Sequence, residues 1–284
     1  MPYFRTDFVS YTMKRHVTIS AIIPGLIDDE IIAGARTHKP KADYPVLYLL
    51  NGYWGDSRSW ERYTAVERYA EEYQIAIITF GGENNAYVNL EDFMPGSYKD
   101  RIFPINYYDF LEKELPDFVE SYFPVSARRD DTYIAGLSMG GYGALLHGFS
   151  NPSRYRAIGA FSPAASAVKS GLLRPESASD PAIIEKYEPL SIIRCQVEKG
   201  EELPDLYYSY GTEDFLFPMC QEFNAELERL GVRHTTKIVE GMRHEWPLWD
   251  KELESFLLWL PRTDFYSKPE NNISASFYGR RRKV

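Results

Sequence analysis

The chain has 284 residues, of which 44% are hydrophobic and 26% charged, and this globular composition excludes wholesale disorder. Its 32 Lys and Arg residues and 41 Asp and Glu residues give a net charge of −9. An acidic chain is a poor candidate for binding nucleic acid, because that affinity depends on cations that meet phosphates. No apolar run is long enough to cross a membrane, so we expect no membrane partner.

The two cysteines, Cys195 and Cys220, are too few for a disulfide scaffold, and neither lies in a cluster with zinc-ligand spacing. The N-terminal residues contain no apolar stretch typical of a secretion signal. We therefore expect a cytoplasmic protein without a metal or an organic cofactor.

Strand patterns recur along the chain. Residues 17–23 alternate apolar with small or polar side chains, which is typical of a strand with one buried face. Short continuous apolar runs predict strands that are buried on both faces of a parallel sheet. These runs lie at residues 46–50, 75–80, 132–135, 157–161, 206–210 and 235–239.

Helical spacing of apolar residues follows between and after these strands. It predicts helices over 107–122, 220–230 and 246–260, with a kink or break at Pro116 in the first of them. This alternation predicts an α/β fold, with a mostly parallel central sheet and helices on both faces. We expect one domain over residues 1–265 and a C-terminal tail over 266–284 that is basic at its end.

Two irregular segments interrupt this rhythm, at residues 81–104 and about 164–204. Long loops inside a compact domain are usually functional or disordered. We expect both segments above the carboxyl ends of the strands, where open α/β sheets build their sites, with 164–204 as a small insertion over the site.

The most informative motif is Gly136-Leu-Ser138-Met-Gly140, between a predicted strand and a predicted helix. A G-x-S-x-G turn in that context is a nucleophile elbow, in which the serine stands above the sheet on a strained backbone. Neighbouring chains crowd this turn, so only small residues fit on either side of the serine. The motif predicts Ser138 as a nucleophile.

A serine nucleophile needs a histidine base, which in this arrangement follows it in the chain. His147 lies within the next helix, where it faces packing or solvent. His234 precedes its strand and so lies at the wrong end of the sheet. His244 follows the last predicted strand and is the predicted base.

The base in turn needs an orienting carboxylate. Asp205 precedes its strand, and Asp180 lies in the irregular segment. Asp214 directly follows a strand and is the predicted acid, with the adjacent Glu213 as the alternative. For the oxyanion hole, the sequence predicts the N–H of Met139 and one from the turn after residues 46–50, donated by either Gly52 or Tyr53.

The chain resembles the esterase D-like α/β hydrolases and, within them, the small bacterial tributyrin esterases. The resemblance covers about residues 15–260 and rests on five groups of matching segments. They are Tyr48-Leu-Leu-Asn-Gly52 with Trp60, Glu114-Leu-Pro116 with Tyr122-Phe-Pro124, Tyr133–Ala144, Gly211–Leu216 and Arg243–Trp246.

The resemblance implies an α/β-hydrolase fold and a serine carboxylesterase that acts on short-chain acyl or acetyl esters. Carried over, Ser138, Asp214 and His244 would be the catalytic triad, and Tyr53 would share the oxyanion hole with Met139. One departure is that many relatives have histidine where this chain has Asn51. The donors are backbone groups, so we expect catalysis to survive this difference.

The resemblance leaves the substrate open. Feruloyl, cinnamoyl or sugar acetyl esters, thioesters of the S-formylglutathione type and acyl transfer to a non-water acceptor are alternatives, as is a non-catalytic binding protein on this scaffold. Relatives are often oligomers, so a homo-oligomer is possible. The aromatic side chains that would line the mouth of the site are Trp54, Tyr87, Phe93, Tyr98 and Trp246.

Overall fold

The computed structural model describes residues 1–93, 105–172, 180–268 and 270–271. A single sheet in these residues has the strand order β1-β2-β4-β3-β5-β6-β7-β8. Strands β1 and β2 form a hairpin, β2 is antiparallel to β4, and every pair from β4 to β8 is parallel. The strands are β1 (Tyr3–Ser10), β2 (Arg15–Ile22), β3 (Val46–Leu50), β4 (Ala76–Phe80), β5 (Thr132–Leu137), β6 (Ala157–Phe161), β7 (Asp205–Gly211) and β8 (His234–Val239).

The predicted parallel core of the sheet is confirmed. Strands β3 and β6 have the predicted bounds, and β3 to β7 are buried along their whole length, as their apolar runs indicated. Strand β1 was not predicted, because it is an outer strand whose polar residues Arg5, Thr6 and Asp7 interrupt the apolar pattern. Only its pairing with β2 makes it a strand.

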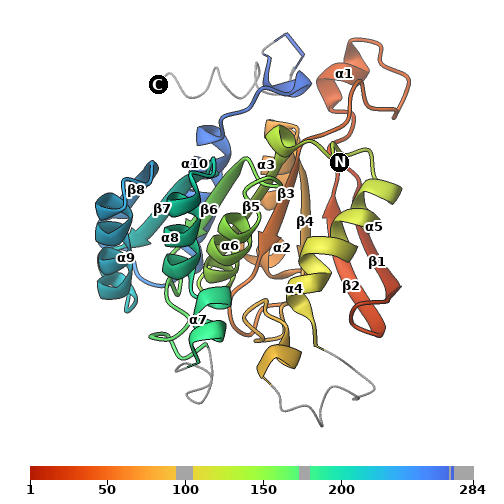
Figure 1. The fold of residues 1–284 in the computed structure, drawn as a ribbon. Helices are drawn as coiled ribbons and strands as arrows, with labels where there is room; N and C mark the ends of the chain where they lie inside the picture. Colours follow the sequence, from red (N-terminus) through yellow and green to blue (C-terminus); the bar gives the residue numbers. More distant parts are fainter. Residues whose placement is uncertain (94–104, 173–179, 269, 272–284) are drawn as a thin grey trace.

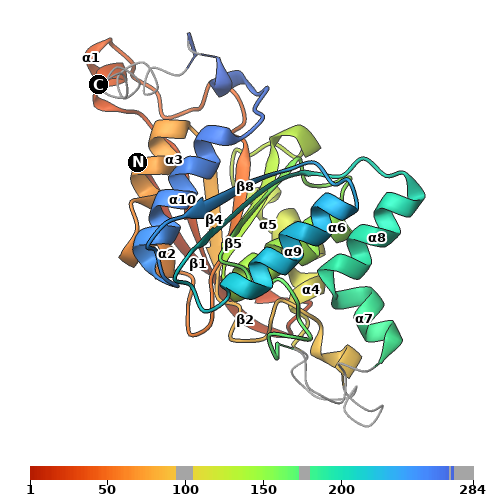
Figure 2. The ribbon, with the colours of Figure 1, turned by 90° about the vertical axis from the view of Figure 1, so that its left-hand side faces the viewer.

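Helices cover both faces of the sheet (Figures 1 and 2). Helices α2 (Ser59–Tyr63), α3 (Val66–Tyr73) and α10 (Trp246–Trp259) pack on one face. The other face is covered by α5 (Leu115–Tyr122), α6 (Met139–Ser150), α8 (Pro189–Lys199) and α9 (Phe217–Arg229). Shorter elements are α1 (Asp28–Ile32), η1 (Leu90–Phe93), α4 (Tyr107–Asp109), η4 (Arg129–Asp131), α7 (Pro181–Tyr187) and η5 (Phe265–Ser267). None of the helices in the described ranges could span a lipid bilayer.

The predicted helix over 107–122 is interrupted near Pro116. Its middle is a π-helical turn, η3 (Phe110–Glu114), and α5 begins at Leu115 with Pro116 in its first turn. Proline has no N–H to donate, and its ring crowds the carbonyl four residues earlier, which belongs to Glu112. The irregularity therefore precedes the proline.

The segment 164–204 is more regular than its composition indicated, since it contains α7 and α8. Ile192 and Ile193 of α8 are buried in the core, and Gln196 donates to the Phe149 carbonyl of α6 at 3.1 Å. Helix α8 thus belongs to the layer that covers the sheet. The first residues of this segment follow β6, and Gly81 follows β4, so both segments start at the carboxyl ends of strands, as predicted.

Candidate active site

The turn between β5 and α6 places Ser138 at the carboxyl end of the central strand. Ser138 has φ 54°, in the left-handed region that a side chain occupies only at a cost. A Cβ on Gly136 would lie 2.3 Å from the Gly140 carbonyl oxygen, and one on Gly140 would lie 2.5 Å from the Leu50 oxygen. The glycines of the motif are therefore required by the close approach of three backbone segments.

The loops after β7 and β8 carry Asp214 and His244, and they are packed backbone to backbone. A Cβ on Gly211 would lie 2.0 Å from the Met242 carbonyl oxygen, and Glu213 donates its N–H to the same oxygen at 3.0 Å. The Leu216 N–H donates to Asp214 Oδ1 at 2.8 Å, which orients the carboxylate. These bonds set the separation of the acid and the histidine before any substrate arrives.

Ser138, His244 and Asp214 form one chain of hydrogen bonds. His244 Nε2 lies 2.9 Å from Ser138 Oγ, and His244 Nδ1 lies 2.9 Å from Asp214 Oδ2. The Asp214 side chain is buried, whereas 16% of the His244 side chain is exposed. Because the carboxylate can only accept, Nδ1 carries the proton and Nε2 is left to accept the serine hydroxyl proton. This geometry can activate a serine for attack on a carbonyl carbon.

Both predicted donors from the turn after β3, the N–H groups of Gly52 and Tyr53, lack an acceptor among the described residues, as does the N–H of Met139. Met139 is the first residue of α6, where N–H groups are free and the helix dipole is positive. Gly52 lies against the serine, since a Cβ on it would be 3.2 Å from Ser138 Cβ. The turn after β3 and the start of α6 thus meet at Ser138.

The aromatic residues predicted at the mouth of the site differ in their surroundings. The Trp54 side chain is 92% exposed, and its backbone N–H donates to Asn84 Oδ1 at 2.7 Å. Trp246 stacks on Tyr63 with ring centroids 4.8 Å apart and meets Trp60 edge to face at 5.5 Å. Tyr98 and the Phe93 side chain lie outside the described residues.

Tyr87 is fully buried, so its predicted place at the mouth is wrong. Sequence patterns also missed Phe215 and Trp249, whose ring centroids lie 4.6 and 4.9 Å from that of His244. The Phe215 side chain is 73% exposed, so it is available to a ligand beside the histidine. Its position immediately after Asp214 is the signal that could have found it.

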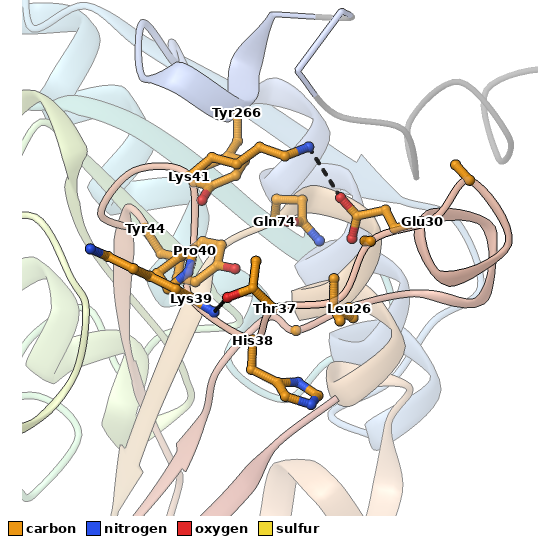
Figure 3. A pocket seen from close by; sticks show the side chains of 13 residues that line it. Leu26, Glu30, Thr37, His38, Lys39, Pro40, Lys41, Tyr44, Gln74 and Tyr266 are labelled. Atoms are coloured by element: carbon orange, nitrogen blue, oxygen red, sulfur yellow. Dashed lines mark hydrogen bonds and ion pairs between the residues drawn. The ribbon is translucent and has the colours of Figure 1, made fainter.

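The pocket in Figure 3 belongs to the opposite end of the sheet. This cavity of about 200 Å³ is lined by Tyr44 and Gln74, which precede β3 and β4, and by Lys39, Lys41 and Tyr266. Ser138, Asp214 and His244 all follow the carboxyl ends of their strands. The cavity is therefore separate from the hydrogen-bonded chain around Ser138.

Residues 34–260 match the protein family named Esterase. The chain belongs to this esterase family. It is 26% identical over 278 residues to an acetyl esterase of Caldicellulosiruptor saccharolyticus, a match that covers 92% of this chain and 99% of that one.

Solved structures of related enzymes have the same fold. The fluorophosphonate-binding serine hydrolase FphF of Staphylococcus aureus matches with a TM-score of 0.74 and 26% identity, over 91% of this chain and 98% of that one. An S-formylglutathione hydrolase from Staphylococcus aureus matches with a TM-score of 0.72 and 27% identity, over the same shares. The esterase family member described here is thus an α/β hydrolase of the esterase D type that acts on carboxylic ester bonds.

Proposed function

We propose that the protein is a serine carboxylesterase that hydrolyses short-chain acyl or acetyl esters through an acyl-enzyme on Ser138. The observation that carries this proposal is the hydrogen-bonded chain from Ser138 through His244 to Asp214. Membership of the esterase family supplies the reaction class, and the acetyl esterase relative supports a small acyl group.

In the proposed mechanism, His244 Nε2 takes the Ser138 hydroxyl proton as Oγ attacks the ester carbonyl carbon. The N–H groups of Met139 and Tyr53 donate to the oxyanion, and Asp214 stabilises the imidazolium. His244 then protonates the leaving alcohol, and the acyl group stays on Ser138. A water molecule, deprotonated by His244, attacks this ester and releases the acid and the serine.

A thioesterase is the second candidate, because one of the similar solved structures is an S-formylglutathione hydrolase. Esters and thioesters use the same triad, so the walls of the pocket decide between them. Trp54 and Trp246, together with Tyr98, are the proposed substrate contacts, and Phe215 beside His244 joins them because its ring is exposed.

The cytoplasm is the proposed location, because Cys195 and Cys220 are both free thiols. We also propose that residues 1–265 form a single catalytic domain. Residues 164–172, which follow β6, and the loop after β4 would border the bound substrate.

The deciding experiment compares wild type and Ser138→Ala on one ester panel. The panel runs from acetyl through butyryl to octanoyl esters and adds methyl ferulate and a glutathione thioester. We expect turnover of the acetyl or butyryl ester to fall by at least about 10³-fold in Ser138→Ala, with the circular dichroism spectrum unchanged. Equal turnover by the two proteins would overturn the assignment of Ser138, and a preference for the thioester would select the second candidate.

A further inference from the structure

A buried hydrogen-bonded pair, His147 and Glu112, lies behind the site, on the core side of α6. His147 Nδ1 lies 2.6 Å from Glu112 Oε1, and His147 Nε2 lies 2.9 Å from the Tyr87 carbonyl oxygen. Because a carbonyl oxygen can only accept, His147 Nε2 donates its proton to the Tyr87 oxygen, while Nδ1 shares a hydrogen bond with the Glu112 carboxyl group. Arg154 Nε lies 3.4 Å from the second carboxylate oxygen, and the Tyr155 hydroxyl donates to the first.

The backbone that the His147 ring contacts is strained. Ala86 and Tyr87 have φ 52° and 58°, the left-handed region that favours glycine. A bulky residue stays in that conformation only where surrounding contacts impose it. The hydrogen bond from His147 to the Tyr87 carbonyl is such a contact, and it fixes where the Tyr87 ring projects.

The Tyr87 ring reaches the turn that follows β3. Its hydroxyl lies 2.9 Å from the Asn51 carbonyl oxygen and 3.1 Å from Asn51 Oδ1. Burial raises the pKa of Tyr87 well above its ordinary value, so the hydroxyl remains a donor. With its Oδ1 occupied, Asn51 directs its Nδ2 to the Gly52 carbonyl oxygen at 2.8 Å.

The direction of the Gly52 carbonyl determines the direction of the Tyr53 N–H. These groups belong to one planar trans peptide, so they point to opposite sides. Asn51 Nδ2 and the Gly55 N–H, at 3.2 Å, hold the carbonyl oxygen. The Tyr53 N–H is thereby turned to the other side of the peptide, where it has no acceptor among the described residues.

We propose that His147 and Glu112 are positioning residues for the oxyanion hole, and that they act through Tyr87 and Asn51 on the Tyr53 N–H. The proposal rests on the proposed function, since it assigns the alignment of one oxyanion donor. A buried pair of ionisable side chains is seldom more stabilising than an apolar pair of the same size. What this pair supplies is a fixed Tyr87 carbonyl and, through it, a fixed Asn51 amide.

The test removes one hydroxyl at each of two buried tyrosines. Tyr87→Phe loses the bonds to Asn51, whereas the control Tyr142→Phe loses a bond of 2.8 Å to the Tyr187 carbonyl on α7. For the best ester of the panel, we expect Tyr87→Phe to lower kcat by at least about tenfold with KM within about twofold of wild type. Tyr142→Phe should keep kcat within about twofold of wild type, although it should lower Tm by about as much as Tyr87→Phe does.

A double variant tests whether His147 acts through Tyr87. We expect His147→Leu to lower kcat and leave KM unchanged, and adding Tyr87→Phe to lower kcat by no more than about twofold further, because both remove one chain of contacts. A kcat of Tyr87→Phe equal to that of Tyr142→Phe would overturn the proposal, even if His147→Leu fails to fold. Absence of Ser138-dependent turnover in wild type would instead overturn the proposed function.

Discussion

The two proposed oxyanion donors, the N–H groups of Met139 and Tyr53, are held in place very differently. The Met139 N–H is fixed by its own neighbours in the sequence, because β5 ends at Leu137, one residue before Ser138, and Met139 begins α6. The Tyr53 N–H lies on a turn without regular structure, and its direction depends on Asn51, Tyr87 and His147, which come from separate parts of the chain.

We call residues Gly136–Gly140, which position the Met139 N–H, the local device. The contacts from Glu112 through His147, Tyr87 and Asn51 to the Tyr53 N–H are the assembled device. The local device is specified by five consecutive residues, so damage to it disturbs the backbone and the fold together. The assembled device is a series of side-chain contacts, so single contacts can be removed with the backbone left in place. We therefore expect variants of the first to lose stability and activity, and variants of the second to lose activity selectively.

The largest effect should come from Gly136→Ala in the local device. The new Cβ would lie 2.3 Å from a backbone oxygen that cannot move without opening the elbow. We expect kcat/KM to fall by about 10³-fold and the free energy of unfolding to fall by about 3 kcal/mol, measured by ester hydrolysis and urea denaturation. Gly81→Ala is the control, because its Cβ would meet no atom closer than 3.7 Å. Wild-type activity in Gly136→Ala would show that the elbow is not closely packed.

Asn51→Ala should break the assembled device at its last contact. It removes the donor to the Gly52 oxygen and one acceptor of the Tyr87 hydroxyl. We expect kcat to fall by roughly 30-fold with KM within about twofold, measured by steady-state kinetics. Asn89→Ala is the matched control, since this buried asparagine accepts the Asp109 N–H at 3.1 Å and does not contact the turn after β3. Equal kcat values for the two variants would contradict a role for the Asn51 amide.

Two glutamates on the same π-helical turn sharpen the comparison further. Glu112 contacts His147, whereas Glu114 accepts from Ser10 Oγ at 2.6 Å and from the N–H groups of Tyr11 and Thr12. We expect Glu114→Gln to lower the free energy of unfolding by about 1–3 kcal/mol and to leave kcat within about twofold, because it loosens only the β1–β2 hairpin.

Glu112→Gln should instead act mainly on activity, so we expect it to lower kcat more than Glu114→Gln does. Urea denaturation and ester kinetics on the two variants measure both quantities. A lower kcat in Glu114→Gln than in Glu112→Gln would contradict the assignment of separate roles.

The smallest effect should be seen at Cys220, which lies behind the elbow. Its Sγ lies 3.5 Å from the Pro163 carbonyl oxygen, and burial raises the pKa of its thiol to about 12. The thiol therefore stays protonated from pH 7 to 9, and the thiolate is the reactive form. We expect iodoacetamide to leave Cys220 of the folded protein unmodified at both pH values, with the denatured protein as control. Mass spectrometry that finds rapid modification at pH 7 would show that the region behind the elbow opens readily.

The local device and the triad could be predicted from the sequence, and the assembled device could not. The sequence predicts the triad of Ser138, Asp214 and His244 because each follows an apolar run that predicts a strand, and parallel strands bring their carboxyl ends together. By contrast, the Glu112 to His147 contact joins two helices, and nothing in the spacing of 35 residues indicates it. The sequence predicts only that His147 faces packing or solvent, whereas the structure shows that it is buried and contacts the Glu112 carboxyl group.

Tyr87 shows why aromatic residues are hard to assign from sequence. A tyrosine in a long loop after a strand fits a substrate contact and a core residue equally well, and here the left-handed backbone turns its ring into the core. The π-helical turn is similar, because Pro116 predicted an interruption but not its type. In both cases a single local backbone conformation, which composition does not encode, decides where the side chain lies.

The contacts of Glu114 also bear on the order of events during folding. The hairpin of β1 and β2 closes over the short turn Tyr11–Lys14, so its ladder forms from neighbouring residues. The hydrogen bond from Ser10 Oγ at the end of β1 reaches Glu114, 104 residues away in sequence, and closing so long a loop is slow. During synthesis the hairpin emerges from the ribosome well before Glu114 does. The amides of Tyr11 and Thr12 therefore remain solvated until the π-helical turn that carries Glu114 docks against the hairpin. The time at which these two amides become protected from hydrogen exchange would show when this edge of the sheet closes.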